Sequence, residues 1–172
     1  MRSITKYLIL FAVTLLLQTL LLDHLTISVY FAPMIYTAVL LLLPVSAPSV
    51  LNLFVGFGAG LVMDILCGTA GLHTIVTTAT GYLRRPLLVA IVGHEGMRDV
   101  NAPSRKSIGS SQFFRYFILM VAIHDLLFYL FETLSAGHLL YTLLRFGAGT
   151  LSSLIFLLVT AHLFTVKTSE RK

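Results

Sequence analysis

The chain has 172 residues, of which 57% are hydrophobic and only 11% are charged, and its mean hydropathy is +0.92. Soluble domains average about 45–50% apolar residues, so this composition predicts an integral membrane protein and leaves no room for a separate soluble domain. The net charge of +5 does not indicate nucleic-acid binding, because the basic residues are scattered over short segments and are not gathered with aromatic residues.

Six apolar segments follow one another along the chain and predict a single all-α, polytopic membrane domain over residues 1–172. Arg2 and Lys6 precede the first segment, and no small-x-small cleavage site follows it, so we expect an uncleaved first span. The second segment is barely long enough to cross a hydrocarbon layer of about 30 Å. The expected transmembrane helices cover about 4–22, 27–43, 50–66, 72–92, 113–134 and 139–166.

Prolines set several of these boundaries, since proline suits the first turn of a helix and breaks its interior. Pro33 opens the second span, and Pro44 ends it. The fourth span either ends at Leu83 or continues through Pro86 to Val92. The one substantial polar loop covers residues 93–112.

The positions of lysine and arginine predict the orientation, because these residues favour the cytoplasmic side of a membrane protein. Six spans with an inner N-terminus place both termini, residues 44–49 and residues 84–112 on the inner side. Every lysine and arginine except Arg145 lies in or beside those segments. The outer segments 23–32, 68–71 and 135–138 contain neither residue. Both termini are therefore predicted to be cytoplasmic.

Small residues and one carboxylate share a face of the third span. Gly56, Gly60, Asp64 and Gly68 follow a four-residue step, which places them on one side of a helix. Glycines at this spacing let two helices approach closely, and close packing is the simplest role for them. An ionised Asp64 inside an apolar run would cost roughly 2.5–3.5 kcal/mol to insert, so it needs a partner.

Polar residues also follow helical spacing on later spans. Thr74, Thr78, Gly81 and Arg85 form such a series on the fourth span. Asp125 and Glu132 are about two helical turns apart on the fifth. These series predict a polar interior shared by several helices.

Arg145 lies inside the sixth span and cannot report the orientation of the chain. Counted from the outer helix ends at about 1.5 Å per residue, its depth falls between those of Asp64 and Asp125. A desolvated guanidinium needs an anion or several carbonyl groups nearby. We therefore hypothesise that Arg145 pairs with Asp64 or Asp125; the alternative is a side chain that extends alone to the outer interface.

No motif of a catalytic, metal or cofactor site is present. The chain has no H-E-x-x-H, G-x-S-x-G, Walker or strand-linked G-x-G-x-x-G pattern. His124 and Asp125 are adjacent, so on a helix they point about 100° apart, unlike paired metal ligands four residues apart. We expect neither an enzyme nor a protein that binds a metal or a cofactor.

The stretch 56–83, GFGAGLVMDILCGTAGLHTIVTTATGYL, resembles the signature region of MreD, the rod shape-determining membrane proteins of bacteria. Its most specific part is the G-x-x-x-D-x-x-x-G pattern of Gly60, Asp64 and Gly68, followed by Gly71 and Tyr82. The likeness extends in outline to the other spans.

This resemblance implies a non-enzymatic subunit of the cell-elongation complex in the bacterial inner membrane. The implied partners are MreC, the MreB filament, the glycosyltransferase RodA and a penicillin-binding transpeptidase, which together direct lateral peptidoglycan synthesis and cell shape. The implied fold is a compact six-helix bundle similar to the substrate-binding subunits of energy-coupling-factor transporters. The residues expected to have structural or partner-binding roles are Gly56, Gly60, Asp64, Gly68, Gly71, Asp125 and Arg145.

Two alternatives remain open at this point. A solute-binding transporter subunit would also have a polar interior open to the outer side. The basic residues of the 84–112 segment could contact a filament or anionic membrane lipids, or could serve orientation alone.

Overall fold

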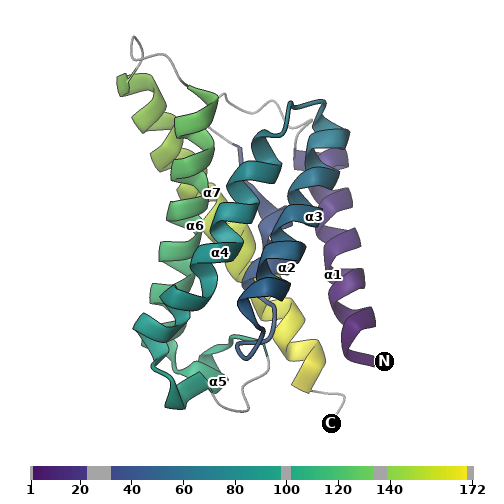
Figure 1. Cartoon of the computed structure of the whole chain (residues 1–172), viewed down its shortest axis with the longest axis vertical. Coiled ribbons are helices and arrows are strands. Elements are labelled where there is room, and N and C mark those ends of the chain that lie inside the picture. The colour runs from purple at the N-terminus through teal and green to yellow at the C-terminus, as the bar shows by residue number, and fades with distance from the viewer. Residues whose placement is uncertain (1, 23–31, 98–101, 134–138, 170–172) are drawn as a thin grey trace.

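The computed structural model describes residues 2–22, 32–97, 102–133 and 139–169, which form an elongated helical bundle (Figure 1). No strand occurs in these residues, so the predicted all-α class is confirmed for this part of the chain. The helical elements are α1 (Arg2–Leu17), the π-helix η1 (Gln18–Leu22), the 3-10 helix η2 (Ile35–Thr37), α2 (Ala38–Leu41), α3 (Ser49–Cys67), α4 (Leu72–Val92), the 3-10 helix η3 (Glu95–Met97), α5 (Arg105–Ile108), α6 (Ser110–Glu132) and α7 (Leu139–Ser169).

Four helices, α3, α4, α6 and α7, are long and apolar enough to cross a membrane. The apolar part of the first helical segment, Thr5–Leu20, is shorter. Large apolar side chains cover the outside of the bundle, and Phe54, Ile65 and Leu140 are each 72% exposed. Such an outer surface suits a hydrocarbon environment, and the chain is therefore a helical membrane protein.

The ends of the helices differ in part from the expected ranges. Helix α4 continues through Pro86 to Val92. Helix α6 begins at Ser110, earlier than expected, and the short elements η3 and α5 lie within the expected loop 93–112.

The expected second span over 27–43 is not a transmembrane helix in its described part. Residues 27–31 lie outside the described residues, 32–34 are not helical, and η2 and α2 together cover only 35–41. Leu40, Leu41 and Leu42 are completely buried. A segment that is apolar on all sides belongs in the middle of a bundle, and here it is a short insert surrounded by other helices.

Two side chains from other helices hold the start of this insert. The Ile35 N–H donates to Gln18 Oε1 at 2.8 Å, and the Met34 N–H donates to Ser153 Oγ at 3.0 Å. Backbone donors in a buried non-helical segment need such partners. The insert is thus fixed to both η1 and α7.

Helices α3 and α4 lie side by side and run in opposite directions (Figure 1). Gly68 ends α3 with φ 68°, and Gly71 precedes α4 with φ 89°. Glycine adopts these left-handed conformations at little cost, which explains its presence at both ends of the turn.

Candidate functional site

Asp64, near the end of α3, binds the first turn of α4. Its Oδ1 accepts from the His73 N–H at 3.0 Å, and its Oδ2 accepts from the Thr74 N–H at 2.8 Å and the Thr74 hydroxyl at 2.5 Å. The Thr69 hydroxyl also donates to Oδ1, and His73 Nδ1 lies 3.1 Å from the same oxygen. The first N–H groups of a helix have no partner within that helix, so Asp64 acts as a cap supplied by the neighbouring helix.

The glycines of α3 allow this contact. A Cβ on Gly60 would lie 2.5 Å from His73 O, and one on Gly56 would lie 2.6 Å from Thr77 O. Gly81 of α4 faces α3 in the same way, since its Cβ would lie 2.6 Å from Asn52 O. The two backbones therefore touch along this face, and Asp64 lies one turn beyond Gly60, where it can reach the start of α4.

A second polar cluster surrounds Tyr36 of η2 in the interior. The Tyr36 hydroxyl lies 3.0 Å from His124 Nε2 and 3.1 Å from Thr77 Oγ1. His124 Nδ1 lies 2.9 Å from Asp125 Oδ1, so the chain of hydrogen bonds links η2 to α4 and α6. The Tyr36 ring also contacts the His73 ring edge-on, with the centroids 5.7 Å apart, which brings this cluster beside Asp64.

Asp125 belongs to this second cluster and does not contact Arg145. One carboxylate oxygen, Oδ1, is bonded to His124, while Oδ2 is buried and has no hydrogen-bond partner in the described part of the chain. The described residues contain no group of three or more histidine, cysteine, aspartate or glutamate side chains that could hold a metal ion. His124 and Asp125 form a hydrogen-bonded pair on one helix.

A third cluster surrounds Arg84, which sequence analysis treated as an inner-surface charge. That interpretation was wrong for Arg84, because its side chain is completely buried, whereas the neighbouring Arg85 is exposed. Arg84 Nη2 donates to Leu43 O at 2.6 Å and Nη1 to Pro44 O at 3.3 Å. The remaining bonds of its guanidinium go to Asn52 Oδ1 at 3.2 Å and the Tyr116 hydroxyl at 2.9 Å.

Tyr116 completes this arrangement, because its hydroxyl in turn donates to Leu41 O at 2.9 Å. Arg84 and Tyr116 thus satisfy the carbonyl groups at the end of α2 and just beyond it. Carbonyl groups at the end of a helix have no partner within it and must find one elsewhere. The cluster ties the buried insert to α4 and α6.

The predicted pairing of Arg145 with Asp64 or Asp125 was wrong. Arg145 of α7 forms an ion pair with Glu132 at the end of α6, with Nη1 2.9 Å from Oε2. Its guanidinium also lies over the rings of Tyr129 and Tyr141, at 5.1 and 5.7 Å from their centroids. The counted depths suggested this pairing because Arg145 was the only partner considered for Asp64, whereas two N–H groups of α4 and two threonine hydroxyls supply its donors.

The seven residues singled out from the sequence therefore fall into separate places. The structure brings Gly56, Gly60 and Asp64 together on α3 against α4, and Gly68 and Gly71 form the turn between these helices. Asp125 and Arg145 belong to two other contacts. Four residues of the polar clusters were not predicted from the sequence: Tyr36, Asn52, Arg84 and Tyr116.

These clusters bind the helices to one another. Asp64, Tyr36, Arg84 and His124 are at most 5% exposed, and their hydrogen bonds within the described residues go to other side chains or to the backbone. Buried polar groups that are bonded in this way rigidify a bundle and specify its packing.

Comparison of the chain with protein-family models, with curated proteins and with solved structures gives no match. The likeness to MreD thus rests on the motif around Asp64, and the structure of that motif is the physical basis for a functional inference.

Proposed function

We propose that this chain is a non-enzymatic assembly subunit of the bacterial cell-elongation complex. In this role it binds MreC in the inner membrane and helps couple MreB filaments to lateral peptidoglycan synthesis by RodA and a penicillin-binding transpeptidase. The observation that supports this role most strongly is the use of Asp64. The carboxylate of the motif that resembles MreD accepts hydrogen bonds from two backbone N–H groups and two hydroxyls, and it lies within the α3–α4 contact.

A carboxylate with this many donors is suited to hold a hairpin in shape. A catalytic carboxylate must instead face a substrate or a reacting proton. The rigid α3–α4 pair exposes Phe54, Phe57, Leu61 and Ile65 on its outer side, an apolar surface of the kind that membrane helices pack against. A subunit whose buried polar residues fix its shape, and whose outer surface is apolar, is suited to assembly within a membrane.

The first test is depletion of the protein in its native bacterium, followed by microscopy and purification of a tagged copy. We expect depleted cells to lose their rod shape and the tagged protein to copurify with MreC. Cells that keep their shape, together with a purification that contains no MreC, would overturn the proposal.

A matched pair of variants links this test to the α3–α4 contact. Gly60→Ala places a Cβ against the backbone of α4, whereas a Cβ on Gly147 of α7 meets nothing within 4 Å. We expect Gly147→Ala to restore the rod shape of depleted cells and Gly60→Ala to restore it poorly. Equal rescue by both variants would show that the contact does not matter for the function.

The alternative function is that of a solute-binding transporter subunit, and one observation favours it. A cavity of about 390 Å³ lies between α1, α2 and α3. Binding sites for small molecules usually measure about 300–1,000 Å³. The Tyr7 hydroxyl is the one polar side-chain group in its lining, so a polar solute would have few partners there. A rise in melting temperature with a water-soluble ligand would favour this alternative.

A further inference from the structure

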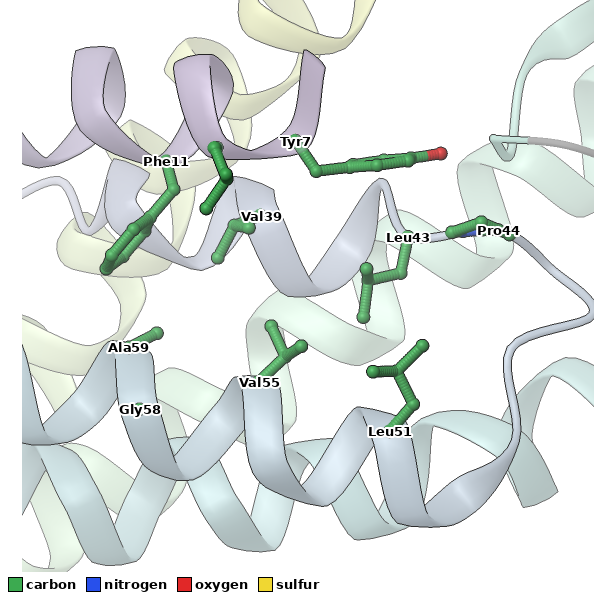
Figure 2. A pocket seen from close by; sticks show the side chains of 10 residues that line it. Tyr7, Phe11, Val39, Leu43, Pro44, Leu51, Val55, Gly58 and Ala59 are labelled. Carbon is green, nitrogen blue, oxygen red and sulfur yellow. The ribbon is translucent and has the colours of Figure 1, made fainter. Parts of the chain in front are cut away.

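The cavity between α1 and α3 is a groove whose floor is formed by α2 and the residues just after it. Figure 2 shows the residues that line it, which include Tyr7 and Phe11 of α1, Val39 and Leu43 from the α2 region, and Val55 and Gly58 of α3. Apart from the Tyr7 hydroxyl, the side chains that line it are apolar. The groove lies on helices whose outer surfaces suit a hydrocarbon layer, so its surroundings are lipid.

The groove is about as long as one leaflet of a membrane is thick. It follows α3 from Leu51 to Ala59, a distance of about 12 Å at 1.5 Å per residue. One leaflet of a hydrocarbon core of about 30 Å is about 15 Å thick. Leu51 lies in the first turn of α3 and Ala59 near its middle, so the groove has the length and position of the chains of a single leaflet.

The groove is small and apolar. Its volume is about 390 Å³ over a length of about 12 Å. An extended hydrocarbon chain is much thinner than a transmembrane helix of about 10 Å diameter. A single chain of this kind can therefore lie inside the groove, whereas a helix would cover its opening.

The end of the groove at Tyr7 and Pro44 lies at the basic end of the bundle, which carries the start of α1 and helix α5 (Figure 1). Lys6 is the residue next to Tyr7, and Arg105 and Lys106 of α5 are exposed at the same end. Of the acidic residues that the structure describes, only Glu95 lies there. Basic residues beside a membrane surface attract anionic headgroups at about 1 kcal/mol each.

We propose that this groove is a binding site for an anionic phospholipid. One acyl chain lies along α3 between Phe11 and Gly58, and the phosphate headgroup lies at the basic end beside Tyr7 and Lys6. The lipid would connect α1 to the α3–α4 pair, because the groove separates these helices. This inference is independent of the proposed role in cell elongation.

The decisive experiment fills the groove through Gly58. A Cβ on Gly58 meets nothing within 4 Å, so Gly58→Phe can place its ring in the groove without moving the backbone. Gly147→Phe is the matched control, because Gly147 of α7 is a helical glycine with equally open surroundings. Both proteins are purified in detergent and titrated with phosphatidylglycerol, and native mass spectrometry counts the bound lipids.

We expect Gly58→Phe to weaken binding of the first phosphatidylglycerol at least about tenfold, a difference of about 1.4 kcal/mol. Gly147→Phe should bind as the wild type does. Equal binding by the two variants would overturn the proposal. If the phenylalanine variant does not fold, Gly58→Val fills the groove less completely and should show a smaller loss in the same direction.

The headgroup is tested with phosphatidylcholine that has the same acyl chains. The wild type should bind phosphatidylglycerol several-fold more tightly, and Lys6→Gln should reduce this preference, because a positive charge beside Tyr7 is removed. Phosphatidylglycerol with a photoreactive group at the end of its chain should label Phe11, Val39 or Ala59, which line the deep end of the groove. Equal affinity for the two lipids, or labels confined to α7, would contradict the proposed site.

Discussion

Two buried charged residues, Asp64 and Arg84, are both bound by the ends of helical segments. Asp64 lies against the first turn of α4, and Arg84 lies in the second half of that helix. Asp64 is 5% exposed and accepts hydrogen bonds from the first turn of α4. Arg84 is 0% exposed and donates to carbonyl groups that follow α2. Neither has an aspartate, glutamate, lysine or arginine partner in the described part of the chain; the ion-pair contact of Asp64 is with His73.

Helix ends can bind charges because they carry backbone groups without internal partners, N–H at the start and C=O at the end. In a low-dielectric interior these groups are worth more than in water. The two sites differ in access to solvent, since Ala70 in the turn beside Asp64 is exposed, while Arg84 is enclosed. After a substitution, water can therefore hydrate the donors that Asp64 had bound more easily than the acceptors that Arg84 had bound.

The largest expected effect follows from Arg84→Leu. The change removes the donors to Leu43 O, Pro44 O and Asn52 Oδ1, and the first and last of these acceptors are left buried. Breaking a buried charged cluster by removing one partner usually costs about 3–5 kcal/mol. We expect a loss of that size in the free energy of unfolding, measured by titration with sodium dodecyl sulfate in mixed micelles.

Arg84→Lys tests whether geometry or charge matters at this site. Lysine keeps the positive charge, but its single nitrogen cannot span the acceptors that a planar guanidinium reaches. We expect this variant to recover less than half of the lost stability. Full recovery would show that the positive charge alone is required at this site, and not the hydrogen bonds of the guanidinium to the carbonyl groups.

The second effect is that of Gly60→Ala, which tests the approach of α3 to α4. The added Cβ would lie 2.5 Å from both His73 O and the Thr74 Cα, so the helices must move apart. Overpacking costs typically about 1–3 kcal/mol, and contact with several backbone atoms of α4, which cannot rotate away, places this variant near 3 kcal/mol. Gly147→Ala is the control and should stabilise the protein by up to about 1 kcal/mol, because alanine favours a helix over glycine.

The third effect is that of Asp64→Asn, which removes the charge and replaces one acceptor oxygen with a donor. Oδ1 accepts from the His73 N–H and the Thr69 hydroxyl, and Oδ2 accepts from the N–H and the hydroxyl of Thr74. We expect a loss of about 2 kcal/mol, less than for Arg84→Leu, since bonds to a charged group contribute about 1.5–3 kcal/mol and water can reach this turn. The combination with Gly60→Ala should cost less than the sum, because separating the helices already weakens the cap. Strict additivity would contradict the shared contact.

The sequence predicts one of the two charge sites much better than the other. The four-residue step from Gly56 to Gly68 places Asp64 on a face of small residues, and the structure places that face against α4. Its binding partners were not predicted, because backbone N–H groups leave no residue signature. A rule that considers the unpaired first turn of the next helix would have identified them.

Arg84 was missed because it stands beside Arg85 and before Pro86, a pattern typical of a membrane edge. Adjacent residues on a helix point about 100° apart, so the two arginines have different surroundings. The series Thr77, Thr80, Gly81 and Arg84 marks the buried face of α4, whereas Arg85 is exposed. The insert containing α2 was missed for a related reason, since an apolar run does not distinguish a short buried segment from a span.

The smallest expected effect on the free energy of unfolding is that of Arg145→Leu, which breaks an ordinary ion pair. Arg145 has an ordinary partner in Glu132, but the two side chains are 19% and 33% exposed, and solvent screens their attraction. Exposed ion pairs contribute about 0.2–1 kcal/mol, and the contact with the Tyr129 ring adds a similar amount at most. We expect a loss of about 1 kcal/mol or less in the same unfolding titration.

Glu132→Gln should lose no more, and the double variant should show a coupling below about 1 kcal/mol. A loss as large as that of Arg84→Leu would mean that an opposite charge at the end of α6 matters as much as the backbone carbonyl groups bound by Arg84.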